Sequence, residues 1–244
     1  MKAFASDLDG TLYFNDLPEK IKAKDIEAIK KWQQNNNLFG VCTGRPLSDV
    51  DLGPIDLDFY IVSSGALVLD KNQQVIHEEL VSFDIIKTIF DQYNDLFYVY
   101  IQGDKKLYCT KAGTLPLRHT LIEDIDSLKN SHLYGISINA LTCENAKKTT
   151  EIINQQFGDY VDAYLNVDCI DIVNKGCSKG SGLKRLKEKM QITYLSGIGD
   201  SYNDLPMLDF VDLAFTFNRS DFEIKQHANY LVDSVNEAIE IVLK

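Results

Sequence analysis

The sequence is short of paired cysteines, long apolar runs and positive charge. Its five cysteines are scattered, odd in number and without a CxxC pair, so neither a disulfide framework nor a zinc site is expected. No apolar stretch approaches the roughly 20 residues that cross a membrane. A secretory leader is not expected either, because Asp7 and Asp9 interrupt the first apolar run. These features predict a soluble protein of a reducing, cytoplasmic compartment, with no membrane partner.

Positive charge is scarce, with 25 Lys and Arg against 36 Asp and Glu and a formal net charge of -11. A protein that binds nucleic acid through the phosphate backbone needs a basic stripe, so nucleic acid is excluded as a partner. A small anionic ligand is not excluded, because a bound cation reverses the field inside a site. With 244 residues, 45% of them hydrophobic, the chain can build one large domain or two modest ones.

The two ends of the chain alternate between strand and helix. The first 81 residues predict strands at 2–6, 38–42 and 58–62 and a helix at 23–34, and Pro46 is suited to open a further helix. From Ser178 onward the same alternation returns, with helices at 179–190 and 235–243 and strands at 194–198 and 213–216. Strand–helix–strand order is typical of a parallel sheet with crossover helices.

The middle of the chain follows another pattern. Two predicted helices, 84–93 and 144–157, are mixed with alternating strands at 97–102, 106–110, 133–139, 160–166 and 169–173. This mixture is typical of an α+β unit. The predicted fold is therefore α/β. A Rossmann-like parallel sheet core with helices on both faces (1–81 and 174–244) is interrupted by a smaller inserted α+β cap domain (82–173).

Two carboxylates stand at the end of the first predicted strand. Asp7 and Asp9 are two residues apart and a glycine turn follows at once. Open parallel sheets bind ligands at the carboxyl ends of their strands. The two carboxylates repel each other when ionised, and a bound divalent cation makes their proximity favourable. An ionised aspartate can attack phosphorus without a base, and a second one can protonate the leaving alcohol. A pair of turn-forming aspartates is the plainer alternative.

Two weaker signals follow later in the chain. Thr43 and Gly44 come directly after the second strand, where a hydroxyl and backbone N–H groups can hold phosphate oxygens. Lys179 stands at the start of a predicted helix, where a positive side chain is mildly unfavourable and a structural reason for it is therefore weak. Such a lysine can neutralise a carboxylate and a phosphoryl group together. Taken alone, these residues are better explained as an ordinary turn and a solvated lysine.

Polar side chains also follow the strand at 194–198. Asp200, Asn203 and Asp204 provide carboxylate and amide groups after a glycine. Magnesium prefers a few carboxylate oxygens, with water and substrate completing its shell. A polar loop with helix-capping acids is the alternative. Because several different strands each end in a phosphate- or metal-competent group within one domain, we expect the groups to act together.

With these four clusters the chain resembles a haloacid dehalogenase superfamily phosphatase of the Cof-type branch, over essentially its full length. Asp7-Leu8-Asp9-Gly10-Thr11 is similar to the DxDGT motif, and Thr43-Gly44-Arg45 to the second motif. Lys179 corresponds to the third motif, and the segment from Gly199 to Asp204 is similar to GDxxND. In this branch a cap is inserted between the second and third motifs, where the α+β unit lies here.

The resemblance implies a role for each residue. Asp7 is implied as the nucleophile and Asp9 as the general acid/base. Thr43, Gly44, Lys179 and Asn203 are implied to bind the phosphoryl group, and Arg45 to contact the substrate or a loop. The resemblance further implies a Mg²⁺ ion held by the side chain of Asp7, the carbonyl of Asp9 and Asp200, with Asp204 supporting the metal or Lys179.

The expected function is a magnesium-dependent phosphatase of small phosphorylated metabolites, such as sugar phosphates, acting through an aspartyl phosphate. A phosphotransferase or phosphomutase shares that intermediate and is one alternative. A non-catalytic metabolite-binding protein is another, although such a protein should have lost at least one of the residues at 7, 9, 179 and 200. The sequence indicates neither the leaving group nor the oligomeric state.

Overall fold

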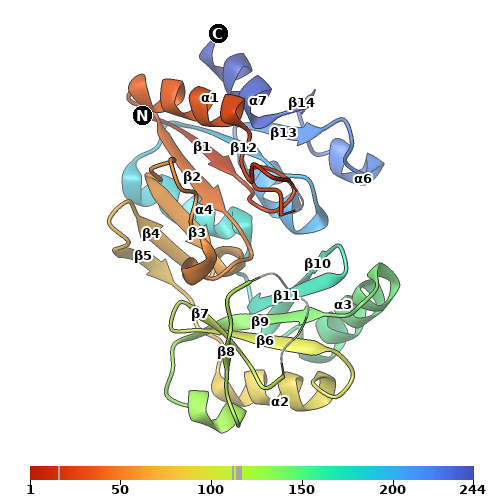
Figure 1. The fold of residues 1–244 in the computed structure, drawn as a ribbon. Helices are drawn as coiled ribbons and strands as arrows, with labels where there is room; N and C mark the ends of the chain where they lie inside the picture. The colour runs from red at the N-terminus through yellow and green to blue at the C-terminus, as the bar shows by residue number, and fades with distance from the viewer. Residues whose placement is uncertain (16, 112, 114–116) are drawn as a thin grey trace.

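The computed structural model describes residues 1–15, 17–111, 113 and 117–244, which form two sheets with their helices (Figure 1). The larger sheet has eight strands in the order β14-β13-β12-β1-β2-β3-β4-β5. In that order the strands are Tyr230–Val232, Leu213–Phe217, Tyr194–Ile198, Lys2–Ser6, Leu38–Cys42, Phe59–Val62, Leu67–Asp70 and Val75–Glu78. Neighbouring strands from β14 to β3 are parallel. The strand order reverses at β1, between β12 and β2, which is where such sheets bind ligands.

Helices cover both faces of this sheet. Helices α1 (Ala23–Gln34) and α7 (Val235–Leu243) pack together on one face. On the other face α4 (Lys179–Met190) packs against α5 (Leu205–Phe210), and the short α6 (Phe222–Lys225) lies near β13. The predicted α/β core with helices on both faces is confirmed.

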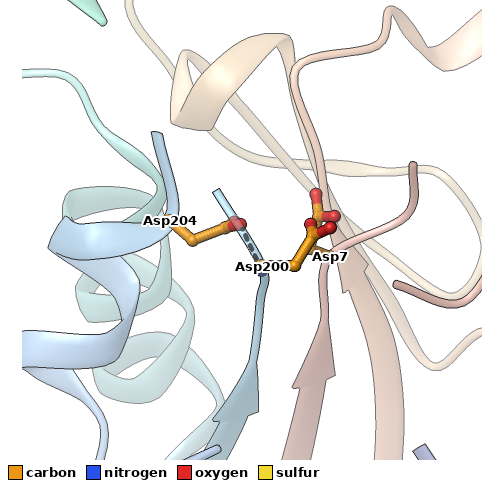
Figure 2. A group of neighbouring side chains, drawn as sticks. All are labelled: Asp7, Asp200 and Asp204. Atoms are coloured by element: carbon orange, nitrogen blue, oxygen red, sulfur yellow. Dashed lines mark hydrogen bonds between the residues drawn. The ribbon is translucent and has the colours of Figure 1, made fainter. Parts of the chain in front are cut away.

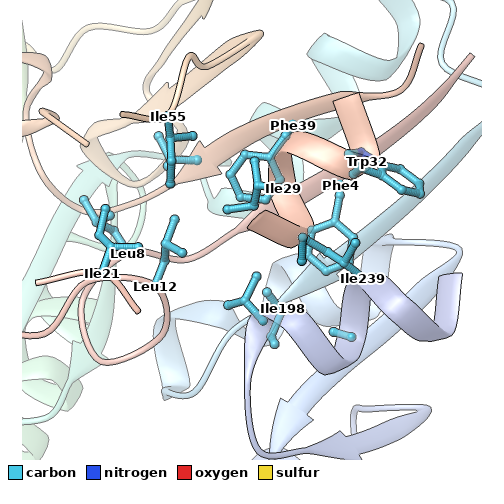
Figure 3. Close-up of a cluster of buried hydrophobic side chains, with 14 of the residues drawn as sticks. Phe4, Leu8, Leu12, Ile21, Ile29, Trp32, Phe39, Ile55, Ile198 and Ile239 are labelled. Atoms are coloured by element: carbon cyan, nitrogen blue, oxygen red, sulfur yellow. The ribbon is translucent and has the colours of Figure 1, made fainter. Parts of the chain in front are cut away.

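The core between β1 and helices α1 and α7 explains why these segments fold as they do. Phe4 on β1 stacks on Phe39 of β2 and on Phe215 of β13, and Trp32 of α1 meets its edge (Figure 3). Trp32 and Phe4 are fully buried. The indole N–H of Trp32 donates to the carbonyl of Leu38 at 2.8 Å, which fixes the helix against the start of β2. These contacts hold α1 against β1 and β2.

The second sheet has six strands in the order β10-β11-β9-β6-β7-β8, antiparallel except for the pairing of β7 with β8. Its strands are, in that order, Val161–Asn166, Cys169–Asn174, Leu133–Asn139, Tyr98–Gly103, Lys106–Cys109 and Thr120–Leu121. Helices α2 (Phe83–Tyr93) and α3 (Cys143–Phe157) lie on the face of this sheet away from the larger unit (Figure 1). Residues 82–173 are called the cap below. The domain boundaries at 81/82 and 173/174 stay a proposal.

Several predicted elements match the structure residue for residue: β1, β2, β9, β12, α1, α4 and α7. Pro46 opens the three-residue 3-10 helix Leu47–Asp49, as expected. The sequence did not predict strands β4 and β5, which extend the parallel part of the core sheet as antiparallel strands. Every helix among the described residues is too short or too polar to span a lipid bilayer.

Candidate active site

Three of the predicted site residues lie at the carboxyl ends of adjacent strands. Asp7 follows β1, Thr43 follows β2, and Asp200 comes two residues after β12. Because β1 pairs in parallel with both β2 and β12, these ends lie at one edge of the sheet. Asp7 and Thr43 are buried, and Asp200 is partly buried. The topology thus collects groups that are far apart in the sequence.

Lys179 links this edge to the helix behind it. It is the first residue of α4, and the hydroxyl of Ser178 caps that helix by accepting from the backbone N–H of Ser181 at 3.0 Å. The Lys179 ammonium donates to Oδ1 of Asp7 at 2.7 Å and to Oδ1 of Asp204 at 2.6 Å. Its side chain is 1% exposed. A fully buried ammonium needs such partners, so the two carboxylates hold the lysine in its charged form.

Asp204 has little freedom left after this contact. Its other oxygen, Oδ2, accepts the backbone N–H groups of Asp200 at 2.9 Å and Ser201 at 3.0 Å. The residue is fully buried. Asp204 therefore fixes both the loop that bears Asp200 and the ammonium of Lys179.

Asp7, Asp200 and Asp204 form a group that could hold a divalent cation. One carboxylate oxygen from each lies within 4.8 Å of the others (Figure 2). Burial, and after it the charge of Asp204, raises the pKa of Asp7 well above its usual range. The same two causes raise the pKa of Asp200 to about 6. A hard divalent cation removes this repulsion. Both oxygens of Asp204 are already occupied, so Asp7 and Asp200 are the better placed ligands.

Two neighbours of Asp200 were not predicted as site residues. The Thr11 hydroxyl donates to Oδ1 of Asp200 at 3.1 Å, and the guanidinium of Arg219 lies 3.9 Å from Oδ2. Arg219 also donates to the carbonyl of Gly10 and stacks 3.7 Å above the centre of the Phe217 ring. Thr11 stood inside the recognised motif. Nothing in the sequence marked Arg219, because its position depends on the packing of β13.

Arg45 contacts Asp9, the other carboxylate of the first motif. Its Nε donates to Oδ2 at 2.7 Å and its Nη2 to Oδ1 at 2.5 Å. Its Nη1 donates to the carbonyl of Asp49 at 3.1 Å, and its guanidinium lies over the ring of Tyr13. The Asp9 side chain is half exposed, whereas Arg45 is buried. Such a bidentate pair fixes the orientation of the Asp9 carboxylate.

A cleft of about 400 Å³ connects these groups with the cap. From the larger unit it is lined by Asp7, Asp9, Gly10, Asn15, Thr43, Gly44, Arg45, Pro46, Asp200, Ser201 and Asn203. From the cap it is lined by Gln102, Leu107, Leu117, Ser137, Asn166, Val167, Asp168, Cys169 and Asp171. Lys179 does not line the cleft itself, but it contacts the lining residue Asp7. All other predicted site residues except Asp204 line this one cleft.

The cap residues at the cleft were missed in the sequence, although strand alternation contained the signal. On β9 and β11 the side chains of Ile136, Ile138, Ile170 and Ile172 are buried in the apolar cluster with α2 and α3. The intervening residues Ser137 and Asp171 therefore point to the opposite face, and they are direct cross-strand partners. Asn203 donates from its amide to Oδ2 of Asp171 at 3.2 Å, which joins the cap to the fourth motif.

Comparison with known proteins identifies the family. The family model of the haloacid dehalogenase-like hydrolases matches residues 4–242. This chain belongs to that family. The predicted superfamily and its hydrolase fold are confirmed.

Curated relatives and solved structures cover nearly the whole chain. A protein of Bacillus subtilis named 5-amino-6-(5-phospho-D-ribitylamino)uracil phosphatase is 24% identical, with 97% of this chain and 94% of the relative aligned. An HMP-PP phosphatase of Yersinia enterocolitica is also 24% identical, over 91% of this chain and 85% of the relative. The subclass IIB sugar phosphatase BT4131 superposes with a TM-score of 0.81 at 17% identity, covering 100% of this chain and 98% of its own. The fold is thus that of phosphatases of this family.

Proposed function

We propose that this chain is a Mg²⁺-dependent phosphatase that hydrolyses small phosphorylated metabolites through an aspartyl phosphate on Asp7. The observation that carries the proposal is the buried ammonium of Lys179 between Asp204 and Asp7, which lines the cleft, with Asp200 close to both carboxylates. Lys179 holds one oxygen of Asp7, and the other accepts no hydrogen bond from the described residues. That second oxygen is the nucleophile in our proposal.

In the first step the free carboxylate oxygen of Asp7 bonds to phosphorus, and the bond from phosphorus to the ester oxygen breaks. Asp9 supplies the proton that the leaving alcohol needs. In the second step Asp9 takes a proton from water while that water attacks the phosphoryl group. Inorganic phosphate leaves and the carboxylate of Asp7 returns, so one water is consumed for each ester.

The remaining residues bind and neutralise the phosphoryl group. Thr43, the backbone of Gly44, and Asn203 line the cleft next to Asp7, where they can donate to phosphoryl oxygens. Lys179 supplies the positive charge. Asp7, the carbonyl of Asp9 and Asp200 would hold Mg²⁺, which supplies further charge neutralisation when bound. Arg45 keeps Asp9 at the cleft mouth until a leaving group competes for one of its oxygens.

The test is hydrolysis of p-nitrophenyl phosphate by the purified protein with Mg²⁺, compared between wild type and Asp7→Asn. The substitution keeps the size of the side chain and removes its nucleophilic charge. We expect activity in the wild type and a loss of at least about a thousandfold in the variant, since a covalent step has no substitute nucleophile. Asp56→Asn removes a charge from an exposed position of the same unit and serves as the matched control.

Full activity of Asp7→Asn in a folded protein would refute the assignment of the nucleophile. Release of inorganic phosphate, rather than transfer to an added alcohol or sugar, separates hydrolysis from phosphotransfer. A cytoplasmic location stays a prediction that fractionation of cells would check.

A further inference from the structure

Asp171 is a cap carboxylate that the proposed chemistry leaves unused. It is 4% exposed, and it lines the cleft beside Asn203, one of the residues proposed to bind the phosphoryl group. It also lies close to the loop that follows β2, because a Cβ atom added at Gly44 would stand 2.6 Å from Oδ2 of Asp171. Any leaving group bonded to a phosphoryl group at Gly44 and Asn203 therefore begins beside this carboxylate.

The contacts of Asp171 are long and come from neutral groups. Ser137 donates to Oδ1 at 3.2 Å, Asn203 to Oδ2 at 3.2 Å and Asn166 to Oδ2 at 3.4 Å. By comparison, the bonds from Lys179 to its carboxylates measure 2.6 and 2.7 Å. Within the described ranges no lysine or arginine forms an ion pair with Asp171. A buried carboxylate usually has a cation or short hydrogen bonds, so this one has unused capacity to accept them.

Neighbouring side chains keep Asp171 in place. Gln102 donates from its amide to the carbonyl of Gly44 and to the hydroxyl of Ser137, both at 2.9 Å. Ser137 in turn donates to Asp171. The carboxylate is thus positioned by hydrogen bonds between the cap and the loop after β2. A carboxylate held in this way can select among ligands that bind between the cap and the loop after β2.

The charge around Asp171 is negative. Five carboxylates line the described part of the cleft, and the one lining cation, Arg45, is already bound to both oxygens of Asp9. The negative charge also affects Cys169. Burial, and after it the charges of Asp168 and Asp171, raises the pKa of its thiol. A leaving group with a second phosphate or a carboxylate would meet repulsion here without a free cation to offset it.

We propose that Asp171 determines the leaving group: it accepts hydrogen bonds from the hydroxyl groups of an uncharged polyol and excludes a second anionic group. This inference rests on the proposed phosphatase function and narrows its substrates to monoesters of neutral polyols. Hydroxyl groups can donate hydrogen bonds to the carboxylate of Asp171, whereas an ionised second phosphate offers only acceptor oxygens.

The test compares fructose 6-phosphate with fructose 1,6-bisphosphate, which differ by one phosphate, as competitive inhibitors of p-nitrophenyl phosphate hydrolysis at fixed free Mg²⁺. For the wild type we expect an inhibition constant at least about tenfold higher for the bisphosphate, because like charges repel strongly in a partly enclosed cleft. In Asp171→Asn, which keeps shape and loses charge, we expect the ratio to fall below about threefold. Asp159→Asn, at an exposed position of the cap, should keep the wild-type ratio.

Equal or tighter binding of the bisphosphate by the wild type would overturn the inference. So would an unchanged ratio in Asp171→Asn, or a failure of fructose 6-phosphate to compete at all. Asp171→Ser is a second variant should the asparagine protein not fold, with the same expected fall in ratio. The proposed function fails differently, through the absence of Asp7-dependent hydrolysis of p-nitrophenyl phosphate.

Discussion

The two sides of the cleft hold their carboxylates in different ways. At the edge of the larger sheet, Asp7 and Asp204 share a buried ammonium through bonds of 2.7 and 2.6 Å. On the cap, Asp171 is nearly as buried but has only neutral partners at 3.2 to 3.4 Å. The first arrangement suits a group that is the same in every substrate, and the second suits one that varies. Removing a charge at the sheet edge should therefore slow the hydrolysis of every substrate. Removing one on the cap should change the rates of some substrates more than others.

The largest effect is expected for Lys179→Met. This change leaves Asp7 and Asp204 buried without a cation, which should cost about 3–5 kcal/mol of unfolding free energy. Hydrolysis of p-nitrophenyl phosphate should fall by at least about a hundredfold, because a charge that stabilises the transition state is lost. Chemical denaturation and steady-state kinetics measure the two effects. Lys184→Met, at an exposed site of the same helix, should change stability by less than about 0.5 kcal/mol.

A double variant sharpens this prediction. Adding Asp204→Asn to Lys179→Met removes one of the two uncompensated charges, so the double variant should be more stable than the single one. Additive losses would show that the ion pair is not the source of the effect.

The next effect concerns the cation. Chelation with EDTA should abolish hydrolysis and added Mg²⁺ should restore it. Asp200→Asn should raise the Mg²⁺ concentration for half-maximal rate by at least about tenfold, since a charged oxygen ligand is replaced by a weaker neutral one. The measurement is the rate as a function of free Mg²⁺. An unchanged requirement would exclude Asp200 as a ligand.

A smaller effect follows from the pKa of Asp200, which the fold raises from 3.8 to about 6. Between about pH 4 and 6 the folded metal-free protein binds more protons at this group than the unfolded chain does, so stability falls as the pH rises through that window. As the pH is raised, the melting temperature of the metal-free wild type should fall relative to that of Asp200→Asn. Mg²⁺ at neutral pH should remove the difference. Parallel melting curves for the two proteins across the window would contradict this sign.

The smallest effect is expected for Gln102→Ala, which removes one hydrogen bond from the cap to the carbonyl of Gly44 and one within the cap to the hydroxyl of Ser137. The loss in stability should be about 1 kcal/mol, the usual value for a net hydrogen bond. The loss in hydrolysis rate should depend on the substrate, being small for p-nitrophenyl phosphate and larger for a sugar phosphate. Equal losses for both substrates would mean that Gln102 supports the sheet edge rather than the cap.

Local patterns predicted much of this molecule. Helix α1, with its apolar face, and the polar groups after β1, β2 and β12 could be placed because their signals lie within a few consecutive residues. The hairpin of β4 and β5 was missed because a short apolar run such as Leu67–Asp70 does not reveal its partner or direction.

The site residues likewise fall into those that the sequence indicated and those that it did not. Asp7, Lys179 and Asp200 each stood in a recognisable motif, and the parallel pairing of the strands predicted that Asp7 and Asp200 lie close together. The pair of Arg45 with Asp9 and the contact of Arg219 with Asp200 depend on side-chain packing between distant segments. The alternation of residues along its strand could have marked Asp171 as facing away from the apolar cluster, but its pairing with Ser137 depends on the register of β11 against β9.

The central claim, that Asp7 bonds to phosphorus, is tested most directly by trapping that bond. Asp9→Asn should release about one equivalent of nitrophenol from p-nitrophenyl phosphate and then stall, because this leaving group needs no acid but the water needs a base. Quenching with borohydride reduces an acyl phosphate to the alcohol, so mass spectrometry should find homoserine at position 7. A burst with an unmodified residue 7, or a reduced carboxylate at another position, would contradict the account.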